Sequence, residues 1–386
     1  MSGFINRLQE VVRDLRRRIT GKDVTVYPSY AHRKGEEWVM PLRVWVHDNR
    51  DTPFVEDAIE RLAARRFAED LGRPLRPEEK TRLDACLANF IADDKADEEV
   101  HFVFDDDPRR EVFRLTGRTT PNGVIETEVR LPAVRLAPLL EGKTGDRRWL
   151  KITATAGGDE GRGSGAVRFL ERTGLSVVSD IDDTVKVTEL PAGRRTVLRN
   201  TFLREFRAAE GMRERYLKLS EDAGPAADVC FHYVSGSPWQ LYELLARFLV
   251  DESRFPAGTF HMKNLRKNLF EPGALDSIKA FALGGDLATL DQKVRQITQL
   301  MLNLPGRQFI LVGDSGEKDP EVYRAIRELF PAQVRKVFIR DVLADRLAGV
   351  ERIAGPGVAV SLDTTDLVAE MKKLIAATAH SDSTTL

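Results

Sequence analysis

The stretch Leu175-Ser-Val-Val-Ser-Asp-Ile-Asp-Asp-Thr-Val-Lys186 joins a short apolar run to three acidic residues and a threonine. Val177, Val178 and Ile181 are β-branched and favour a buried strand. Carboxylates crowded at the end of such a strand do not suit a core, because a buried unpaired charge is very costly. Asp180 and Asp182 stand two positions apart, so an extended chain points both to the same side. We therefore expect a bound cation at this strand end.

Beyond this stretch, apolar segments of strand length alternate with segments of helical pattern. The strand-like segments are residues 175–180, 229–234, 309–312, 336–339 and 358–362, and the helix-like segments are 201–221, 238–249, 320–329 and 367–376. Such alternation predicts an α/β unit with a parallel sheet and helices on both of its faces. In such sheets, binding sites form at the carboxyl ends of the strands.

The preceding part of the chain is rich in β pattern. Seven segments alternate or run apolar at strand length: 24–27, 38–46, 101–104, 111–115, 124–131, 149–155 and 166–170. With polar turns between them, they predict a small antiparallel β-sandwich-like domain. Residues 53–95 interrupt it with two helical patterns that Pro74 and Pro77 separate, and we interpret them as an insertion. The glycine-rich run Gly157–Gly165 matches no phosphate-binding motif and is expected to be a flexible loop.

The ends of the chain have their own patterns. Residues 4–19 place apolar side chains on one helical face and several arginines on the rest, which suits a helix packed on its own domain or one lying on an anionic membrane. The Ser/Thr-rich tail 377–386 is expected to be disordered. The predicted organisation is an amphipathic helix at 1–21, a β-sandwich-like domain at 22–171, an α/β domain at 172–376 and the tail.

Composition excludes several classes of function. The chain has 386 residues, of which 42% are hydrophobic and 31% charged, a balance typical of globular proteins. A net charge of −1 gives no basic field for nucleic acid. Two cysteines in so long a chain suggest a reducing compartment. No apolar window is long enough to span a membrane and no signal sequence is visible, so we expect a cytoplasmic protein.

Three further features follow in the order that phosphoryl transfer requires. The stretch Tyr233-Val-Ser-Gly-Ser-Pro238 ends the second predicted strand, and Gly313-Asp-Ser-Gly-Glu-Lys-Asp319 follows the third. Between them lies Lys293 in a helical segment, our choice over Lys263, Lys267 and Lys279. Strand-end acids alone are commonly turn or cap residues, and Ser-Gly-Ser-Pro alone is as easily a helix start. The order and the strand placement of the features together favour a catalytic site.

Each residue type has a chemical role in such a site. Asp180 can attack phosphorus and form an aspartyl-phosphate, while Asp182 protonates the leaving oxygen and then deprotonates water. Mg²⁺ prefers oxygen ligands, and Asp314 and Asp319 supply carboxylates near the first pair. We expect the phosphoryl oxygens to be bound by Ser235, the backbone amide of Gly236 and Lys293.

Asp-x-Asp-x-Thr after an apolar strand resembles the signature of haloacid-dehalogenase-type phosphohydrolases. The three longer motifs, at 179–186, 233–240 and 309–321, resemble the actin-patch-type phosphatidate phosphatase family, and Tyr27-Pro-Ser-Tyr30 with its β-rich segment resembles bacterial members. The similarity covers about residues 22–375 and is strongest over 175–345. The helical insertion at 53–95 has no place in the family pattern.

The resemblance implies a haloacid-dehalogenase-like parallel sheet and a Mg²⁺-dependent phosphoric monoester hydrolase that converts phosphatidate to diacylglycerol. It implies Asp180 as nucleophile and metal ligand, Asp182 as acid/base, Ser235 and Lys293 as phosphate ligands, and Asp314 with Asp319 at the metal. We include Asp182 among the candidate metal ligands. A phospholipid substrate places the protein at a membrane surface as a peripheral, cytoplasmic enzyme without a transmembrane span.

The identity of the substrate is less constrained. Thr184, Trp239 and Arg340 are candidates for substrate contact, although Thr184 also suits a loop-pinning role and Asp183 a turn. Apolar residues near the strand ends suit either acyl chains or an ordinary core: Phe202, Phe206, Phe255 and Phe260. The alternatives are the same chemistry on a soluble phosphomonoester or a phosphoprotein, and a non-enzymatic binding module. Neither the oligomeric state nor the role of the β-rich domain follows from the sequence.

Overall fold

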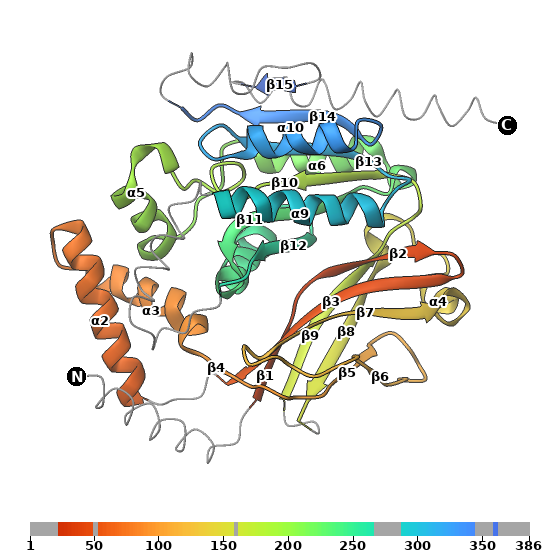
Figure 1. Ribbon diagram of the computed structural model, residues 1–386, viewed down its shortest axis with the longest axis horizontal. Coiled ribbons are helices and arrows are strands. Elements are labelled where there is room, and N and C mark those ends of the chain that lie inside the picture. The colour runs from red at the N-terminus through yellow and green to blue at the C-terminus, as the bar shows by residue number, and fades with distance from the viewer. Residues whose placement is uncertain (1–21, 49–52, 158–160, 266–286, 344–357, 362–386) are drawn as a thin grey trace.

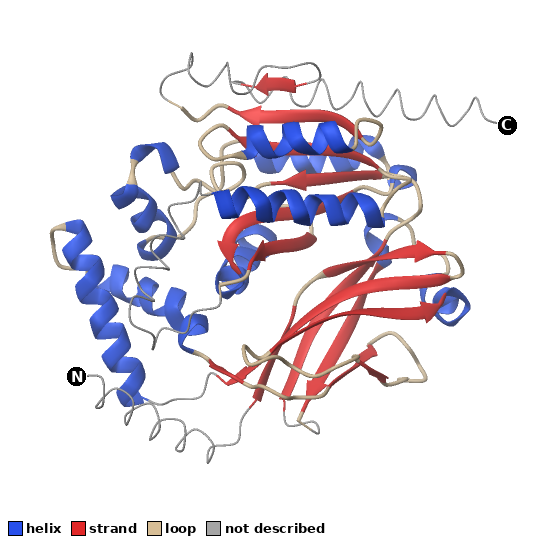
Figure 2. Cartoon of the chain, in the orientation of Figure 1, coloured by secondary structure: helices blue, strands red, loops and turns tan. Residues whose placement is uncertain are grey.

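The computed structural model describes residues 22–48, 53–157, 161–265, 287–343 and 358–361 (Figure 1). The helix expected near the amino terminus, the helix expected at 367–376 and the tail lie outside the described residues, as do Lys267 and Lys279. The described chain forms a β-rich part, an α/β part and a pair of helices beside them (Figure 2). Within it, no helix combines the length and the apolar composition that a membrane crossing requires.

The β-rich part is one sheet of nine strands. They are β1 (Lys22–Val26), β2 (Ser29–Lys34), β3 (Glu37–Asp48), β4 (Asp93–Asp94), β5 (Val100–Phe104), β6 (Phe113–Arg114), β7 (Val124–Pro132), β8 (Trp149–Ala156) and β9 (Gly161–Phe169). Their order is β1-β3-β2-β9-β8-β5-β6, with β4 and β7 also paired to β3. All seven predicted strands are present and most neighbours are antiparallel, which confirms the prediction at that level.

The two-sheet sandwich that we expected differs from this arrangement. β1 and β2 pair with β3 on one side and run parallel to β9 on the other, so hydrogen bonds join the halves into one sheet. The parallel pairing and β2 itself were not predicted. Apolar residues at every second position of β3, β5 and β8 share one core cluster with α4 (Ala133–Leu140). The helical turn η1 (Gly145–Arg148) precedes β8.

The glycine-rich run is mostly strand where the structure describes it, and only Gly157 lies in a turn. Residues 161–165 belong to β9, and only residues 158–160 lie outside the description. A Cβ atom on Gly163 would lie 1.7 Å from the carbonyl oxygen of Val24, and one on Gly165 would lie 2.5 Å from a methyl carbon of Val26. The glycines therefore allow β1 to approach β9 closely, as glycine within a strand often does.

The α/β part contains a six-stranded parallel sheet, as predicted. Its strands are β10 (Leu175–Ser179), β11 (Cys230–Pro238), β12 (Gly258–Lys263), β13 (Gln308–Asp314), β14 (Val334–Arg340) and β15 (Val358–Ser361), in the order β12-β11-β10-β13-β14-β15. Every neighbouring pair is parallel. β12 was not predicted, because its sequence Gly-Thr-Phe-His-Met-Lys lacks a continuous apolar run.

Helices cover both faces of this sheet. Val177 faces one buried cluster and Val178 faces another, as alternation along a strand requires. α9 (Leu287–Asn303) and α10 (Asp319–Leu329) cover the face of Val178, and α6 (Met212–Ala223) lies on the other (Figure 1). The remaining helical elements are η2 (Leu190–Ala192), α5 (Arg194–Leu198), η3 (Arg199–Leu203), η4 (Pro225–Ala227), η5 (Trp239–Leu241), α7 (Tyr242–Ala246) and η6 (Arg247–Glu252).

The helix expected at 201–221 is interrupted in the structure. The backbone N–H of Val187 donates to Arg207 (2.8 Å) and that of Ala209 donates to Val185 (2.8 Å). These bonds hold the chain after η3 in a non-helical conformation against the loop that follows β10. The helical pattern resumes as α6 after Gly211, whose φ of 69° is in the left-handed region.

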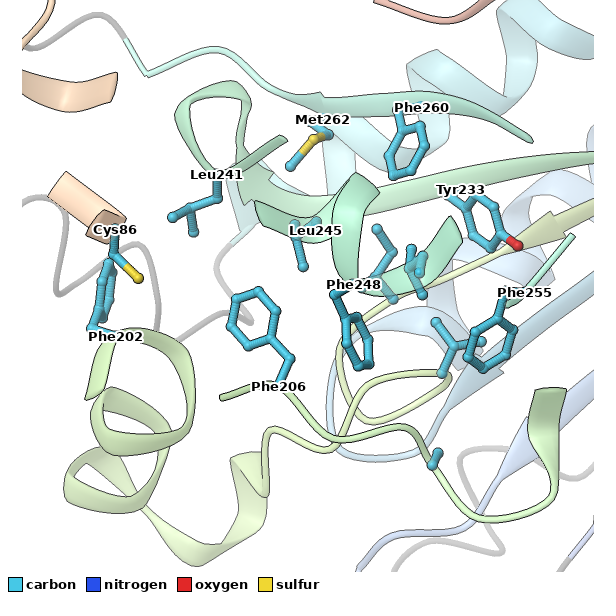
Figure 3. Close-up of a cluster of buried hydrophobic side chains, with 14 of the residues drawn as sticks. Cys86, Phe202, Phe206, Tyr233, Leu241, Leu245, Phe248, Phe255, Phe260 and Met262 are labelled. Atoms are coloured by element: carbon cyan, nitrogen blue, oxygen red, sulfur yellow. The ribbon is translucent and has the colours of Figure 1, made fainter. Parts of the chain in front are cut away.

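The inserted helices are α2 (Pro53–Leu71) and α3 (Pro77–Ile91), as predicted. In chain order they interrupt the β-rich sheet, but their side chains complete the core of the α/β part. The ring of Phe67 lies 5.5 Å from that of Phe202, edge to face. The Cys86 thiol points to the Thr201 carbonyl at 3.8 Å, within the cluster that Figure 3 shows.

A buried ionic group joins the two sheets. Asp228 accepts hydrogen bonds from Arg168 of β9 (2.7 Å) and from Arg307 (2.8 Å), which precedes β13. Arg307 also donates to the carbonyl of Leu175 at the start of β10 (2.8 Å). All three charged side chains are buried, and pairing of this kind offsets the cost of burying them. The β-rich sheet is thus fixed at the amino-terminal end of β10.

Candidate active site

Asp180 stands directly after β10, at the carboxyl edge of the parallel sheet. Its backbone N–H donates to the Val312 carbonyl of β13 (2.9 Å), which continues the strand pairing up to the acid itself. The side chain is buried. Oδ1 accepts a hydrogen bond from Lys293, whereas buried Oδ2 has no hydrogen-bond partner among the described residues. Burial raises the pKa of Asp180 well above its usual range, and the neighbouring acids add to this effect.

The loop after β13 brings two more carboxylates to the same place. Asp314 ends the strand, and its Oδ1 accepts hydrogen bonds from the backbone of Gly316 (2.6 Å) and Glu317 (3.3 Å). Asp319 begins α10, and its Oδ2 accepts from the backbone of Asp314 (3.3 Å). A Cβ atom on Gly313 would lie 2.4 Å from Asp319 Oδ2. Glycine at 313 is therefore what allows Asp319 to approach the strand end.

Lys293 projects from α9 into this acidic group. Its ammonium donates to Asp180 (2.7 Å), Asp319 (2.7 Å) and Glu317 (3.0 Å), and all four side chains are buried. Burial alone would lower the pKa of Lys293, but the three carboxylates raise it well above its usual value. The lysine is therefore a permanent positive charge at the strand edge. Of the other lysines considered, Lys263 donates to Thr289 (3.0 Å), and Lys267 and Lys279 lie outside the described residues.

The acids fit a divalent cation. Asp180, Asp314 and Asp319 each offer one oxygen, and the three oxygens lie within 4.8 Å of one another. Asp180 Oδ2 and Asp314 Oδ2 are both buried without a hydrogen-bond partner in the described part of the chain. With Glu317, the group contains four buried carboxylates and one ammonium, that of Lys293, which contacts three of them. The group therefore has an excess of negative charge. Oxygen-only ligands suit Mg²⁺.

Asp182 lies apart from that group of three acids. Its Oδ1 accepts from Lys186 (2.5 Å) and from the Thr188 hydroxyl (2.7 Å), while Oδ2 accepts from Ser237 (3.1 Å). Burial alone would raise the pKa of Asp182, but Lys186 and these hydrogen bonds lower it. The inclusion of its side chain among the metal ligands therefore lacks support from the geometry. The same contacts hold a carboxylate beside the loop that residues 235–238 form at the irregular end of β11.

That loop presents hydroxyl and amide groups. The Ser235 hydroxyl accepts from the backbone N–H of Ser237 (2.9 Å) and lies 3.4 Å from Asp182 Oδ2. The Ser235 carbonyl accepts from Gln292 of α9 (3.2 Å), one residue before Lys293. A Cβ atom on Gly236 would lie 2.9 Å from the Thr289 side chain. These contacts bring the predicted phosphate loop against the helix that carries Lys293.

The remaining residues of the first motif shape the loop. Asp183 accepts from the backbone N–H groups of Thr188 (2.8 Å), Glu189 (2.7 Å) and Leu190 (2.6 Å), and its own φ is 54°. Arg340 donates to the Asp183 carbonyl (2.5 Å). Asp183 is thus the turn residue that we expected. Arg340 therefore contacts the backbone of the loop, which is a structural role, and its guanidinium does not lie on an open surface.

The other two candidates for substrate contact have different surroundings. The Thr184 side chain is fully buried, and its hydroxyl has no hydrogen-bond partner among the described residues. The Trp239 ring packs 4.5 Å from Tyr27 and under the guanidinium of Arg43. The aromatic residues considered for acyl chains, Phe202, Phe206, Phe255 and Phe260, are all buried in the core cluster of Figure 3.

The structure therefore brings together most of the predicted site: Asp180, Asp182, Ser235, Gly236, Lys293, Asp314 and Asp319. The sequence analysis missed Lys186 and Glu317. Lys186 stands four residues after Asp182 and ends the opening motif, a spacing that a loop can close into an ion pair. Glu317 follows Asp314 by three residues, and its acidity within the motif was the available signal.

Comparison with known proteins agrees with this geometry. Residues 175–341 match the model of a protein family described as phosphatidate phosphatase APP1, catalytic domain. The chain is 33% identical over 174 residues to phosphatidate phosphatase APP1 of Saccharomyces cerevisiae. It is 29% identical over 184 residues to an uncharacterised protein of Schizosaccharomyces pombe. These matches cover 45% and 46% of this chain.

The matches are confined to a part of each relative: the chain spans only 27% of the length of either one. Among solved structures, a beta-glucuronidase of Ruminococcus gnavus overlaps 83% of this chain and 48% of its own, at 8% identity and a TM-score of 0.23. An overlap this weak does not indicate a shared fold. The similarity that bears on the site is therefore the one over residues 175–341, which contains every predicted site residue.

Proposed function

We propose that the chain hydrolyses phosphatidate to diacylglycerol and inorganic phosphate, because residues 175–341 match the family model described as phosphatidate phosphatase APP1, catalytic domain. One observation carries the proposal. The buried Asp180 carboxylate keeps Oδ2 without a partner in the described structure, while Lys293 holds Oδ1 and a group of acids suited to a cation surrounds it. A nucleophile of this kind needs a fixed position and a free oxygen lone pair.

In the first step, Asp180 attacks phosphorus and the bond from phosphorus to the lipid oxygen breaks. The resting Asp182 carboxylate is ionised, so the proton that it passes to that oxygen comes from the phosphate monoanion of the substrate; the oxygen leaves as the alcohol, and Asp180 carries the phosphoryl group as an acyl phosphate. In the second step, Asp182 takes a proton from water, whose oxygen attacks phosphorus. Inorganic phosphate leaves and the Asp180 carboxylate is restored. Ser237 and Lys186 keep Asp182 oriented through both steps.

Ser235, the Gly236 amide and Lys293 are proposed to bind the phosphoryl oxygens. Lys293 stands 2.7 Å from Asp180, so a phosphoryl group on that carboxylate lies within its reach. A Mg²⁺ ion held by Asp180, Asp314 and Asp319 supplies charge neutralisation between carboxylate and phosphate when it is bound. We also propose that the parallel sheet is of the haloacid-dehalogenase type and that the enzyme meets its lipid at a membrane surface, peripheral and cytoplasmic.

A second candidate is the same reaction on a soluble phosphomonoester. The aromatic residues that suited acyl chains in the sequence are core residues: Phe206 lies 5.5 Å from Phe248, and Phe260 lies 5.4 Å from Tyr233. Phe260 also borders a cavity of about 490 Å³ whose lining includes none of the site acids, and the other rings are packed in the core. The observation favours a smaller, more polar alcohol as leaving group.

Phosphate release with Mg²⁺ separates the two candidates. We would compare phosphatidate in mixed micelles with soluble substrates such as glycerol 3-phosphate and p-nitrophenyl phosphate, using the wild type and Asp180→Asn. The lipid proposal expects the highest kcat/KM on phosphatidate and a loss of at least about 10³-fold in Asp180→Asn. Activity confined to soluble esters would contradict the lipid substrate. No activity on any ester would contradict the phosphatase itself.

A further inference from the structure

A cavity lies where three parts of the chain meet, and none of the acids of the candidate active site lines it. Its volume is about 570 Å³, within the usual range for small-molecule sites. The β-rich sheet contributes Tyr27, Arg43 and Trp45, the inserted helix α3 contributes Asn89, and the segment after β11 contributes Trp239 and Gln240. The wall of the cavity is therefore built from residues far apart in sequence.

Two aromatic rings in its wall are held rigidly. Trp45 stacks on His47 at 3.7 Å between ring centroids, and its indole N–H donates to Asp94 (2.8 Å). Trp239 packs against Tyr27, with Arg43 4.6 Å above its ring. His47 lies on Trp45 and Arg43 lies on Trp239, so the parts of the two indoles that line the cavity are held in place and can contact a ring-shaped ligand without an ordering cost.

The polar groups of the wall include both a donor and an acceptor that lack partners. Arg43 Nε and Gln240 Oε1 are buried atoms without a hydrogen-bond partner in the described part of the chain. Two charge pairs of the wall are matched within the protein, and the remaining acid, Asp94, accepts from the Trp45 indole N–H, with burial raising its pKa to about 6. Arg43 pairs with Glu126, and Asp93 pairs with Lys95 (2.9 Å). A charged ligand would therefore have to compete with ion pairs that already exist.

From this combination we propose that the cavity binds a neutral polyhydroxylated ring, such as a sugar or a cyclitol. Hydroxyl groups both donate and accept, so one such ring satisfies Arg43 Nε and Gln240 Oε1 together. Its C–H faces suit the rings of Trp45 and Trp239. Amide side chains at the rim, those of Asn89, Asn122 and Asn264, offer further hydrogen bonds to hydroxyls.

The cavity lies at the same edge of the parallel sheet as the candidate active site. Trp239 and Gln240 directly follow the loop Ser235–Pro238, and Asn264 follows the last residue of β12. Carboxyl ends of neighbouring parallel strands are about 5 Å apart, so the cavity lies at the same edge of the sheet as the acids. A ring bound there is either a free solute or the headgroup of a membrane lipid that holds the protein near its substrate.

The test is a binding experiment that does not depend on catalysis. We would titrate myo-inositol and glucose into the full-length wild type and Asp180→Asn by calorimetry, with choline and inorganic phosphate as charged comparators. We expect saturable binding of a ring polyol with a dissociation constant of about 1–10 mM in both proteins. A parallel sedimentation assay uses phosphatidylcholine vesicles with and without phosphatidylinositol to detect the lipid-linked form.

Variants assign the binding to this cavity. Gln240→Leu and Asn122→Ala should each weaken polyol or phosphatidylinositol-vesicle binding at least fivefold. Lys218→Gln, an exposed position of α6 outside the cavity, should bind like the wild type. Asn122 lies in an exposed turn, so its variant remains informative if Gln240→Leu fails to fold. Absence of saturable binding in both assays, stronger binding of choline or phosphate, or binding unchanged in both cavity variants would overturn the proposal.

Discussion

Lys186 is the residue that defines the state of Asp182. Its ammonium contacts Asp182 Oδ1 and the Thr188 hydroxyl, both at 2.5 Å, and all three side chains are buried. The ring of Phe206 lies 5.1 Å from the same ammonium. Because Lys186 lowers the pKa of Asp182, the ionised form of that acid persists to lower pH than it would without the lysine.

Replacement of Lys186 with methionine should therefore raise the pKa of Asp182. The limb of the pH–rate profile that reports Asp182 should move to higher pH, and kcat should fall by about 10²-fold because the acid/base group loses its position. Profiles of kcat/KM for Lys186→Met and the wild type check this. Lys218→Met, on the outer part of α6, is the matched control and should leave the profile in place.

A structural role alone would lower the stability of Lys186→Met without displacing the limb, and that result would contradict the proposed control of Asp182. If the single variant does not fold, an Asp182→Asn/Lys186→Met double variant offers a second test. Removal of both charges should restore part of the stability, since an unpaired buried carboxylate costs about 3–5 kcal/mol.

At the scale of single elements, contacts at the start of α3 fix the position of the inserted helices. Glu79 accepts two hydrogen bonds from Arg73 (2.6 and 2.8 Å) and one from the backbone N–H of Arg76 (2.9 Å). Arg73 is the main cause that lowers the pKa of Glu79 to about 2. Pro77 occupies the first turn, where its missing N–H is harmless. The helix then buries Leu83, Leu87 and Phe90 against the α/β part.

Glu79→Ala should destabilise the protein by about 1–3 kcal/mol, because it removes a helix cap and a part-buried ion pair. The folded pKa is lowered, so this stability is present above the ordinary glutamate pKa and is lost as pH falls toward about 2. Urea unfolding at pH 7 measures the difference. Glu78→Ala, next to it and exposed, is the control. Equal stability of the two variants at pH 7 would show that the contacts of Glu79 contribute nothing.

The elements also show where sequence reasoning works and where it stops. Val177 and Val178 lie in a run that the packed helices bury on both faces of the sheet, and such runs identified the parallel sheet. β12 and β2 are short and carry polar residues, so local pattern did not reveal them. Gly163 resembled a loop residue, because the close approach of Val24 is a contact between distant segments. Partners that are distant in sequence leave no local pattern.

The same holds for the site. Asp180, Asp314 and Lys293 were predictable because each stands at a strand edge or on the helix that the chemistry requires. The pairing of Asp182 with Lys186 and the burial of Phe202 under α2 depend on the folded arrangement of loops and insertion. The composition of the motif indicated that acids are present. It did not indicate which of them lie close enough together to share a cation.

At the scale of the whole molecule, the acidic group links metal binding to stability. Burial raises the pKa of Asp314 well above its usual range, with Asp319 and Glu317 adding to the effect, so ionisation of this group opposes folding as pH rises. A cation bound by the folded state alone should offset that cost, with a gain of about 1–3 kcal/mol at 10–100 times its dissociation constant.

Mg²⁺ should therefore raise the melting temperature of the wild type, and EDTA should reverse the rise. Asp314→Asn should melt higher than the wild type without Mg²⁺ and should lose the response to the ion. Asp251→Asn, an exposed acid of η6, should respond like the wild type. Differential scanning calorimetry at matched ionic strength measures all three proteins. An undiminished Mg²⁺ response in Asp314→Asn would rule out a metal site at this group.

The proposed reaction requires Asp180 to carry the phosphoryl group during turnover. The most direct measurement is to quench turning-over enzyme in acid, reduce the acyl phosphate with borohydride, and locate the product by peptide mass spectrometry. Reduction converts an aspartyl-phosphate to homoserine, so the account predicts homoserine at residue 180 in the wild type only when Mg²⁺ and substrate are present. Sustained turnover with aspartate unchanged at 180, or with homoserine at another position, would contradict it.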